Sequence, residues 1–153
     1  MSTIHRDAIM KKLADAHVVY KHFTHEPVTT SQHASEIRGV PLSSGAKALV
    51  LTDKKSGTNI LVVIPADKKI DFDKLKNVTG NKYSFASDPE NVVGCVPGSV
   101  PPFGSVLGLQ TYADTTLADT LNFNIGLLTE SVSLSKQDYF ITEQPILGDF
   151  IKE

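Results

Sequence analysis

The sequence contains a single cysteine, Cys95, among its 153 residues. A lone cysteine excludes an internal disulfide and a zinc site of the CxxC type, and it is typical of a reducing compartment. No stretch approaches the roughly 20 apolar residues that span a membrane, and the first residues lack the apolar run of a signal peptide. We therefore expect a cytoplasmic protein with no membrane partner.

An excess of charge of one sign is also lacking. The chain has 15 Lys and Arg residues against 17 Asp and Glu residues, a net charge of -2. A protein that binds along a nucleic acid through many phosphates is basic, so binding along DNA or another duplex is not expected. Contact with one nucleic-acid end, through one or two cations, stays open.

The remaining composition is that of a folded domain, with 41% hydrophobic and 21% charged residues. We find no internal repeat and no break in composition, which predicts a single domain over residues 1–153. The chain begins with Met1 and shows no linker, which favours a free-standing protein.

The spacing of apolar residues predicts many short elements. Helices are expected over residues 3–16, 31–38, 71–77 and 136–143, with a short one that begins at Pro89 behind a Ser87 cap. Strands are expected over residues 17–23, 45–52, 60–65, 82–86, 106–110, 122–125 and 131–134. Because the links are short, antiparallel hairpins are favoured over regular βαβ repeats. The predicted fold class is α/β, a curved, mixed and mostly antiparallel sheet or partly closed barrel surrounded by short helices.

Lys47 is the most informative residue of the strongest predicted strand. It shares one face of that strand with Leu49 and Leu51, while Ala48 and Val50 share the other, so both faces are otherwise apolar. A lysine there must send its amine to a cavity, a carboxylate or an anionic ligand. One interpretation is a phosphate or carboxylate ligand at a pocket mouth. The other is a lysine whose amine reaches solvent at the end of the strand.

The run GSVPPFG over residues 98–104 is the second feature. Its glycines and prolines predict a stiff, sharply bent loop. Such a loop aims backbone N–H and C=O groups at a ligand, although a plain connection between strands is the alternative.

Four runs in this order resemble the YbaK/ProX aminoacyl-tRNA deacylases, relatives of the editing insertion domain of bacterial prolyl-tRNA synthetases. They are HEPVTTSQHASEIRGVPLSSGAKALVL, ILVVIPADKKID, the Gly-x-x-x-Pro loop at Gly98 to Pro102, and FNIGLLTESVSL. The resemblance covers the chain from about Phe23 to Phe140.

This resemblance implies hydrolysis of the ester that links a wrong amino acid, a small one, to the 3′-terminal adenosine of a tRNA, typically the tRNA for proline. It places the family's lysine on Lys47, which meets the phosphate or ribose of the terminal nucleotide. It places the loop that holds the aminoacyl group on Gly98 and Pro102. Catalysis in the family is substrate-assisted, with no metal and no cofactor. The implied partners are the aminoacyl-tRNA 3′ end and prolyl-tRNA synthetase.

The resemblance leaves the amino acid open. The alanine-specific branch has Phe-His-Pro where this chain has Phe123, Asn124 and Ile125. The cysteine-specific branch has Gly-Lys-Arg-Gly where this chain has Gly-Leu-Leu-Thr, and its acidic pocket residue falls on Ser131. The helix over residues 31–37 should also line the pocket. The residues expected at the substrate are Thr30, Ser31, Ala34, Ile37, Ser99, Val100, Pro101, Phe103, Asn124, Gly126, Thr129 and Ser131, with Ala34 and Ile37 setting the depth.

Other interpretations carry less weight. His22, His25 and His33 are close in sequence but fall on a strand, a loop and a helix, which disfavours zinc. Cys95 precedes the loop but has no evident histidine partner in the sequence for a nucleophilic role. A binding module that recruits a tRNA or a synthetase is the alternative to the enzyme, and a filled or collapsed pocket would favour it.

Overall fold

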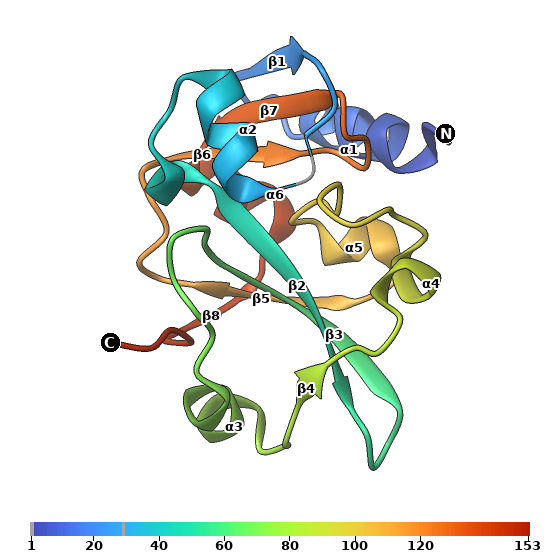
Figure 1. Cartoon of the computed structure of the whole chain (residues 1–153), viewed down its shortest axis with the longest axis vertical. Helices are drawn as coiled ribbons and strands as arrows, with labels where there is room; N and C mark the ends of the chain where they lie inside the picture. The colour runs from blue at the N-terminus through green and yellow to red at the C-terminus, as the bar shows by residue number, and fades with distance from the viewer. Residues whose placement is uncertain (1, 29) are drawn as a thin grey trace.

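The computed structural model describes residues 2–28 and 30–153, and its strands form two sheets (Figure 1). The strands are β1 (Tyr20–Thr24), β2 (Ala46–Asp53), β3 (Thr58–Pro65), β4 (Ser84–Phe85), β5 (Gln110–Asp114), β6 (Thr120–Asn124), β7 (Glu130–Ser135) and β8 (Ile146–Gly148). The helices are α1 (Ile4–Asp15), α2 (Ser31–Arg38), α3 (Phe72–Thr79), α4 (Pro89–Val93), α5 (Gly104–Leu107) and α6 (Lys136–Glu143), with a 3-10 turn η1 (Leu42–Ser44).

Between them, the two sheets contain antiparallel and parallel strand pairs. The three-stranded sheet, in the order β1-β7-β6, is antiparallel. The five-stranded sheet, in the order β4-β2-β3-β5-β8, is antiparallel at β4-β2-β3 and parallel at β3-β5-β8. One bridge between Gly45 and Asn122 connects the start of β2 to β6. The predicted class, mixed, mostly antiparallel and surrounded by short helices, is confirmed, with the strands divided between two sheets.

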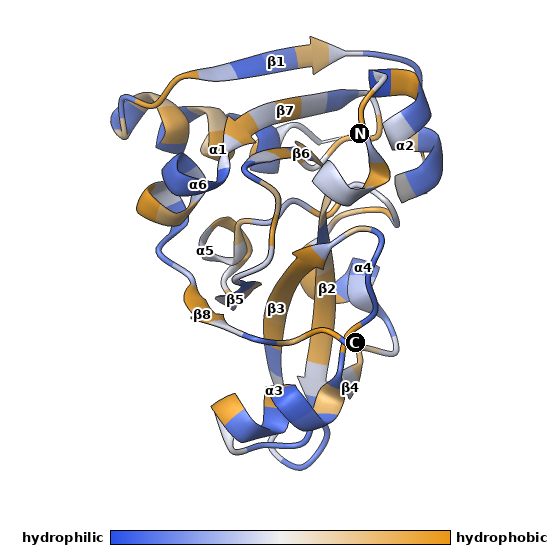
Figure 2. Ribbon diagram, turned by 90° about the vertical axis from the view of Figure 1, so that its left-hand side faces the viewer, coloured by the Kyte–Doolittle hydropathy of each residue, from blue (hydrophilic) through white to orange (hydrophobic). Residues whose placement is uncertain are grey.

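The predicted hairpin of β2 and β3 is confirmed and separates two hydrophobic cores. Alternate side chains of a strand point to opposite faces. Val50 and Leu61 accordingly lie in the core beneath α1 and α6, whereas Leu51 and Val62 lie in the core beneath α3. Figure 2 shows apolar residues along most of both strands. Burial of both faces explains why the sequences of these strands are nearly continuous apolar runs.

The strand predicted over residues 106–110 is wrong. Its first two residues belong to α5. The backbone N–H of Gly104 donates to Thr111 Oγ1 at 2.8 Å, and that of Ser105 donates to Glu143 Oε2 at 3.0 Å. These two bonds satisfy N–H groups that a helix leaves free in its first turn. Gly108, with a φ of +76°, ends the helix, and β5 begins at Gln110.

Two smaller expectations also change. Asp88 rather than Ser87 caps α4, because its side chain accepts from the backbone N–H of Asn91, with Pro89 in the first turn. The C-terminal tail, for which no strand was predicted, adds β8 to the edge of the larger sheet. No helix in the part of the chain that the structure describes is both long and apolar enough to cross a membrane.

Candidate active site

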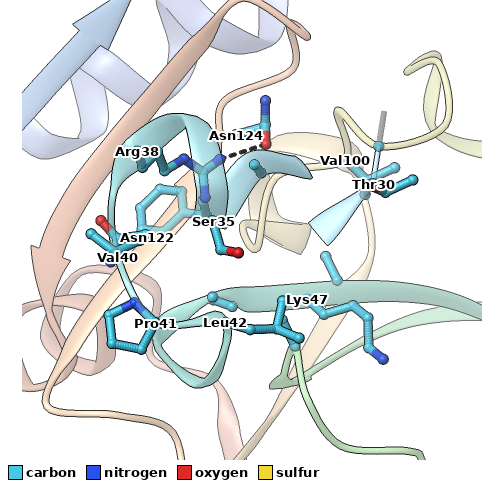
Figure 3. A pocket seen from close by; sticks show the side chains of 17 residues that line it. Thr30, Ser35, Arg38, Val40, Pro41, Leu42, Lys47, Val100, Asn122 and Asn124 are labelled. Atoms are coloured by element: carbon cyan, nitrogen blue, oxygen red, sulfur yellow. Dashed lines mark hydrogen bonds between the residues drawn. The ribbon is translucent and has the colours of Figure 1, made fainter. Parts of the chain in front are cut away.

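A cavity of about 230 Å³ lies between α2, η1, the start of β2, the end of β6 and the loop that contains Gly98 (Figure 3). The sequence-predicted residues that line it are Thr30, Ala34, Lys47, Gly98, Val100 and Asn124. Segments far apart in the sequence therefore meet around one space. The bridge between Gly45 and Asn122 holds the start of β2 against β6 at this point.

Lys47 lies at one side of the cavity, in the first half of β2. Its Nζ donates to the carbonyl oxygen of Lys68 at 2.8 Å, and it forms no ion pair with any carboxylate among residues 2–28 and 30–153. Burial lowers the pKa of the Lys47 ammonium, opposed by Asp67 and assisted by Lys69. An ammonium has three donors, so two remain for an anionic ligand.

The loop over residues 98–102 is fixed from several sides. Gly98 has a φ of +87°, a conformation that favours glycine. Ser99 is buried; its hydroxyl donates to the carbonyl of Val96 at 2.8 Å, and its own carbonyl accepts from the N–H of Gly126 at 2.9 Å. The hydroxyl of Tyr139 donates to the carbonyl of Pro102 at 2.6 Å. The bent loop is therefore held rigidly at the cavity wall.

Most of this loop supports the cavity without lining it. Only Gly98 and Val100 are on its wall. Pro101 and Pro102 are buried, and Phe103 belongs to the core, where its ring packs edge-on against that of Tyr139. The first half of the loop therefore contributes to the cavity wall, and the buried second half anchors it.

Helix α2 forms another wall. The Thr30 side chain accepts from the N–H of His33 at 3.0 Å and caps the helix as predicted, and Ala34 is buried. Ile37, which we expected to set the depth of the pocket, is 38% exposed and does not line this cavity. Residues four apart share a helix face, so Arg38 takes the place beside Ala34. The side chain of Ser31 lies outside the described part of the structure.

Arg38 is a charged residue of the cavity lining that was not among the sequence-predicted site residues. Its Nε and Nη2 donate to Ser131 Oγ at 3.0 and 2.8 Å, and Nη2 also donates to Asn124 Oδ1 at 2.8 Å. Burial lowers the pKa of its guanidinium to about 10, so it remains charged at neutral pH. The signal in the sequence was its spacing from Ala34.

Asn124 and Ser131 are direct partners across β6 and β7. Asn124 lines the cavity, whereas Ser131 is fully buried behind Arg38. Two other predicted residues, Gly126 and Thr129, do not line the cavity. Gly126 has a φ of +93°, and a Cβ there would come within 2.9 Å of the Cβ of His5. The Thr129 carbonyl accepts from the N–H of His25 at 2.9 Å.

The histidines and the cysteine have other surroundings. His22 Nε2 lies 2.8 Å from Glu130, His25 Nε2 lies 2.7 Å from Ser131 Oγ, and His33 lies 3.6 Å from Glu26. Among the described residues, no three His, Cys, Asp or Glu side chains are placed to hold a metal ion. Cys95 is buried, and burial raises the pKa of its thiol to about 11.

Residues 25–140 match the family model of the aminoacyl-tRNA editing domain. The chain therefore belongs to this family of hydrolytic editing domains, which confirms the resemblance read from the sequence and the predicted class of enzyme.

Individual relatives agree with this family. The chain is 40% identical over 135 residues to the Escherichia coli multifunctional Ser/Thr-tRNA deacylase ProXp-y, covering 83% of this chain and 81% of the relative. It is 29% identical over 110 residues to the proline–tRNA ligase of Aromatoleum aromaticum, covering 64% of this chain but 19% of the ligase. The fold matches that of a protein proposed to be a trans-editing enzyme for prolyl tRNA synthetase, with a TM-score of 0.79 at 18% identity, over 100% of this chain and 99% of the other.

Proposed function

We propose that this protein hydrolyses the ester between a small amino acid and the 3′-terminal adenosine of a mischarged tRNA, acting in trans. One observation carries the proposal: Lys47, the Gly98 loop and the polar residues of α2 and β6 line the same cavity. A positive charge and a rigid backbone wall thereby lie at one space, which is what binding of a nucleotide phosphate beside an ester carbonyl requires.

In the proposed mechanism, positioning supplies most of the rate. An aminoacyl ester is already activated, so a fixed geometry and a polarised carbonyl lower much of the barrier. Lys47 binds the phosphate or ribose of the terminal nucleotide, and the backbone of Gly98 to Pro102 holds the aminoacyl group. The free ribose hydroxyl helps to activate water, whose oxygen attacks the carbonyl carbon. The ester C–O bond then breaks, and the ribose oxygen takes up a proton to give the free amino acid and the tRNA.

Serine and threonine are the amino acids that we propose first. The E. coli relative is named as a Ser/Thr-tRNA deacylase, and the cavity wall of this chain contains Arg38, Asn122 and Asn124. The proline tRNA and an association with prolyl-tRNA synthetase, both implied by the sequence resemblance, remain part of the proposal. So does action in the cytoplasm, where charged tRNAs are used.

The test is hydrolysis of a panel of esters by the full chain. Serine, threonine, alanine and cysteine would each be placed on the proline tRNA, and serine and threonine also on each other's tRNA. Lys47→Ala should slow hydrolysis about 10- to 100-fold, because a hydrogen bond to a charged group is lost. Lys21→Ala removes an exposed lysine on β1 and serves as the matched control.

The outcomes separate the enzyme from the binding module. Hydrolysis that depends on Lys47 but not on Lys21 supports the deacylase and names its substrate. A protein that binds tRNA but cleaves no ester faster than buffer would instead be a binding module.

A further inference from the structure

The guanidinium of Arg38 is surrounded by neutral partners and retains unused donors toward the cavity. Its Nε and Nη2 contact the Ser131 hydroxyl and the Asn124 amide oxygen. A guanidinium has five N–H donors, two of them on Nη1. Across residues 2–28 and 30–153, the hydrogen bonds of the guanidinium all come from Nε and Nη2, and neither Nη1 hydrogen has an acceptor in the protein. In Figure 3 the guanidinium lies across the cavity from Lys47.

The partners of Arg38 make further hydrogen bonds of their own. His25 Nδ1 lies 2.7 Å from the carbonyl oxygen of Glu26, which only accepts, so Nδ1 carries the hydrogen. In the neutral ring Nε2 is then an acceptor, and Ser131 donates its hydroxyl hydrogen to it at 2.7 Å. The Ser131 oxygen is left to accept from Arg38. Asn124 Nδ2 donates to the carbonyl of Leu127 at 3.0 Å, so its Oδ1 is the atom that faces Arg38.

An acceptor on β6 lines the same cavity. Asn122 and Asn124 are two residues apart on β6 and therefore point to the same face, and both line the cavity. Asn122 Nδ2 donates to Ser44 Oγ at 2.9 Å, which leaves its Oδ1 as an acceptor. The cavity lining thus contains a charged donor from α2, Arg38 Nη1, and a neutral acceptor from β6, Asn122 Oδ1.

This arrangement suits a hydroxyl better than a carboxylate or a methyl group. A carboxylate binds arginine most strongly through two nitrogens at once. Here both hydrogens of Nη2 and that of Nε are occupied, so only Nη1 is available. A single oxygen that accepts from Nη1 and donates to an amide oxygen satisfies both groups. A methyl group would bury both without partners.

We propose that Arg38, oriented by Ser131 and Asn124, is the specificity-determining residue that binds the side-chain hydroxyl of the substrate amino acid. This inference rests on the proposed function and assigns Lys47 and Arg38 to opposite ends of one substrate, the nucleotide and the amino-acid side chain. It makes seryl and threonyl esters better substrates than alanyl esters. Sites built to hydrogen-bond a substrate group discriminate strongly against an analogue that lacks it.

The experiment compares seryl and alanyl esters on the same tRNA with the full chain. We expect the wild type to hydrolyse the seryl ester with a kcat/KM about 10- to 100-fold higher. Arg38→Met should reduce this ratio to about 1 by slowing only the seryl reaction. Arg38→Lys, which keeps the charge but not the planar fork, should not restore the ratio. Ser131→Ala should give an intermediate ratio, and Gln32→Ala, an exposed position on α2, should leave it unchanged.

Two further measurements keep the result interpretable. Thermal unfolding of each variant shows that it is folded. Binding of a seryl and an alanyl adenosine in which an amide replaces the ester measures discrimination without hydrolysis. Equal loss of both reactions in Arg38→Met, or an unchanged ratio, overturns the inference while leaving the deacylase intact. The wild type could also bind the seryl amide better than the alanyl amide yet cleave no ester. That result would contradict the proposed function and support the role of Arg38.

Discussion

The hydroxyl of Tyr139 donates a hydrogen bond of 2.6 Å to the carbonyl oxygen of Pro102. Tyr139 is fully buried in α6, and its ring also packs edge-on against that of Phe103. A helix near the C-terminus of the chain therefore fixes the second half of the loop whose first half lines the cavity. The position of Gly98 depends in this way on a side chain far away in the sequence.

We expect Tyr139→Phe to loosen this loop without unfolding the protein. The change leaves the buried carbonyl of Pro102 without a partner, at a cost of about 1–3 kcal/mol in the free energy of unfolding. Because small displacements of a positioning group reduce rates strongly, hydrolysis should fall by up to about 100-fold. Thermal unfolding and ester hydrolysis measure the two effects. Tyr112→Phe, at a half-buried tyrosine in the other core, is the control and should retain activity. Full activity in Tyr139→Phe would show that the loop does not depend on this bond.

A second prediction concerns the backbone at Gly98. Alanine at a φ of +87° is strained, at a cost of roughly 1–2 kcal/mol. Gly57, in the β2–β3 turn, has a φ of +76° and open space where a Cβ would lie, so Gly57→Ala should lose similar stability. Of the two variants, only Gly98→Ala should lose activity, because Gly98 lines the cavity and Gly57 does not. Equal activities of the two variants, measured by ester hydrolysis, would contradict a role for the loop conformation.

Local sequence signals predicted the elements whose causes are themselves local. The β2–β3 hairpin follows from two apolar runs around a polar turn, and α2 follows from Thr30 at its start and Gly39 at its end. The strand expected at residues 106–110 failed because its alternative depends on distant partners. Glu143 and Thr111 accept the N–H groups of the first turn of α5, and no local pattern reveals them.

The candidate site likewise contains residues that a local sequence pattern reveals and residues that it does not. Lys47 and Gly98 stand out because a cation in an apolar strand and a Gly/Pro cluster are visible in one segment. Arg38 does not, because a basic residue in the last turn of a helix is ordinary. Its partners Asn124 and Ser131 become neighbours only through the pairing of β6 with β7. Ile37 was expected beside Ala34 in the pocket, and a spacing of three residues also shares a helix face, but the cavity is lined by Ala34 and Arg38.

The thiol of Cys95 should be unreactive in the folded protein. Burial raises its pKa to about 11, so less than about 0.1% is ionised near neutral pH, and the thiolate is the reactive form. A chromogenic disulfide reagent should therefore label it slowly in buffer and rapidly in denaturant, and Cys95→Ala should hydrolyse esters at the wild-type rate. Rapid labelling in buffer with parallel loss of activity would instead identify Cys95 as a nucleophile.

The pH dependence of substrate binding should report the charge of Lys47. Burial lowers the pKa of this ammonium below that of an ordinary lysine, so the charged form is lost at a lower pH. If the charge binds a phosphate, affinity is high below this pKa and falls as the pH rises through it. A non-hydrolysable aminoacyl-adenosine phosphate, with an amide in place of the ester, allows titration of the dissociation constant at alkaline pH. Lys47→Arg should move the loss of affinity to higher pH, because a guanidinium stays charged, whereas Lys47→Met should bind weakly at every pH. A profile that is the same in the wild type and in Lys47→Arg would mean that another group carries the dependence, and that Lys47 is not the phosphate ligand.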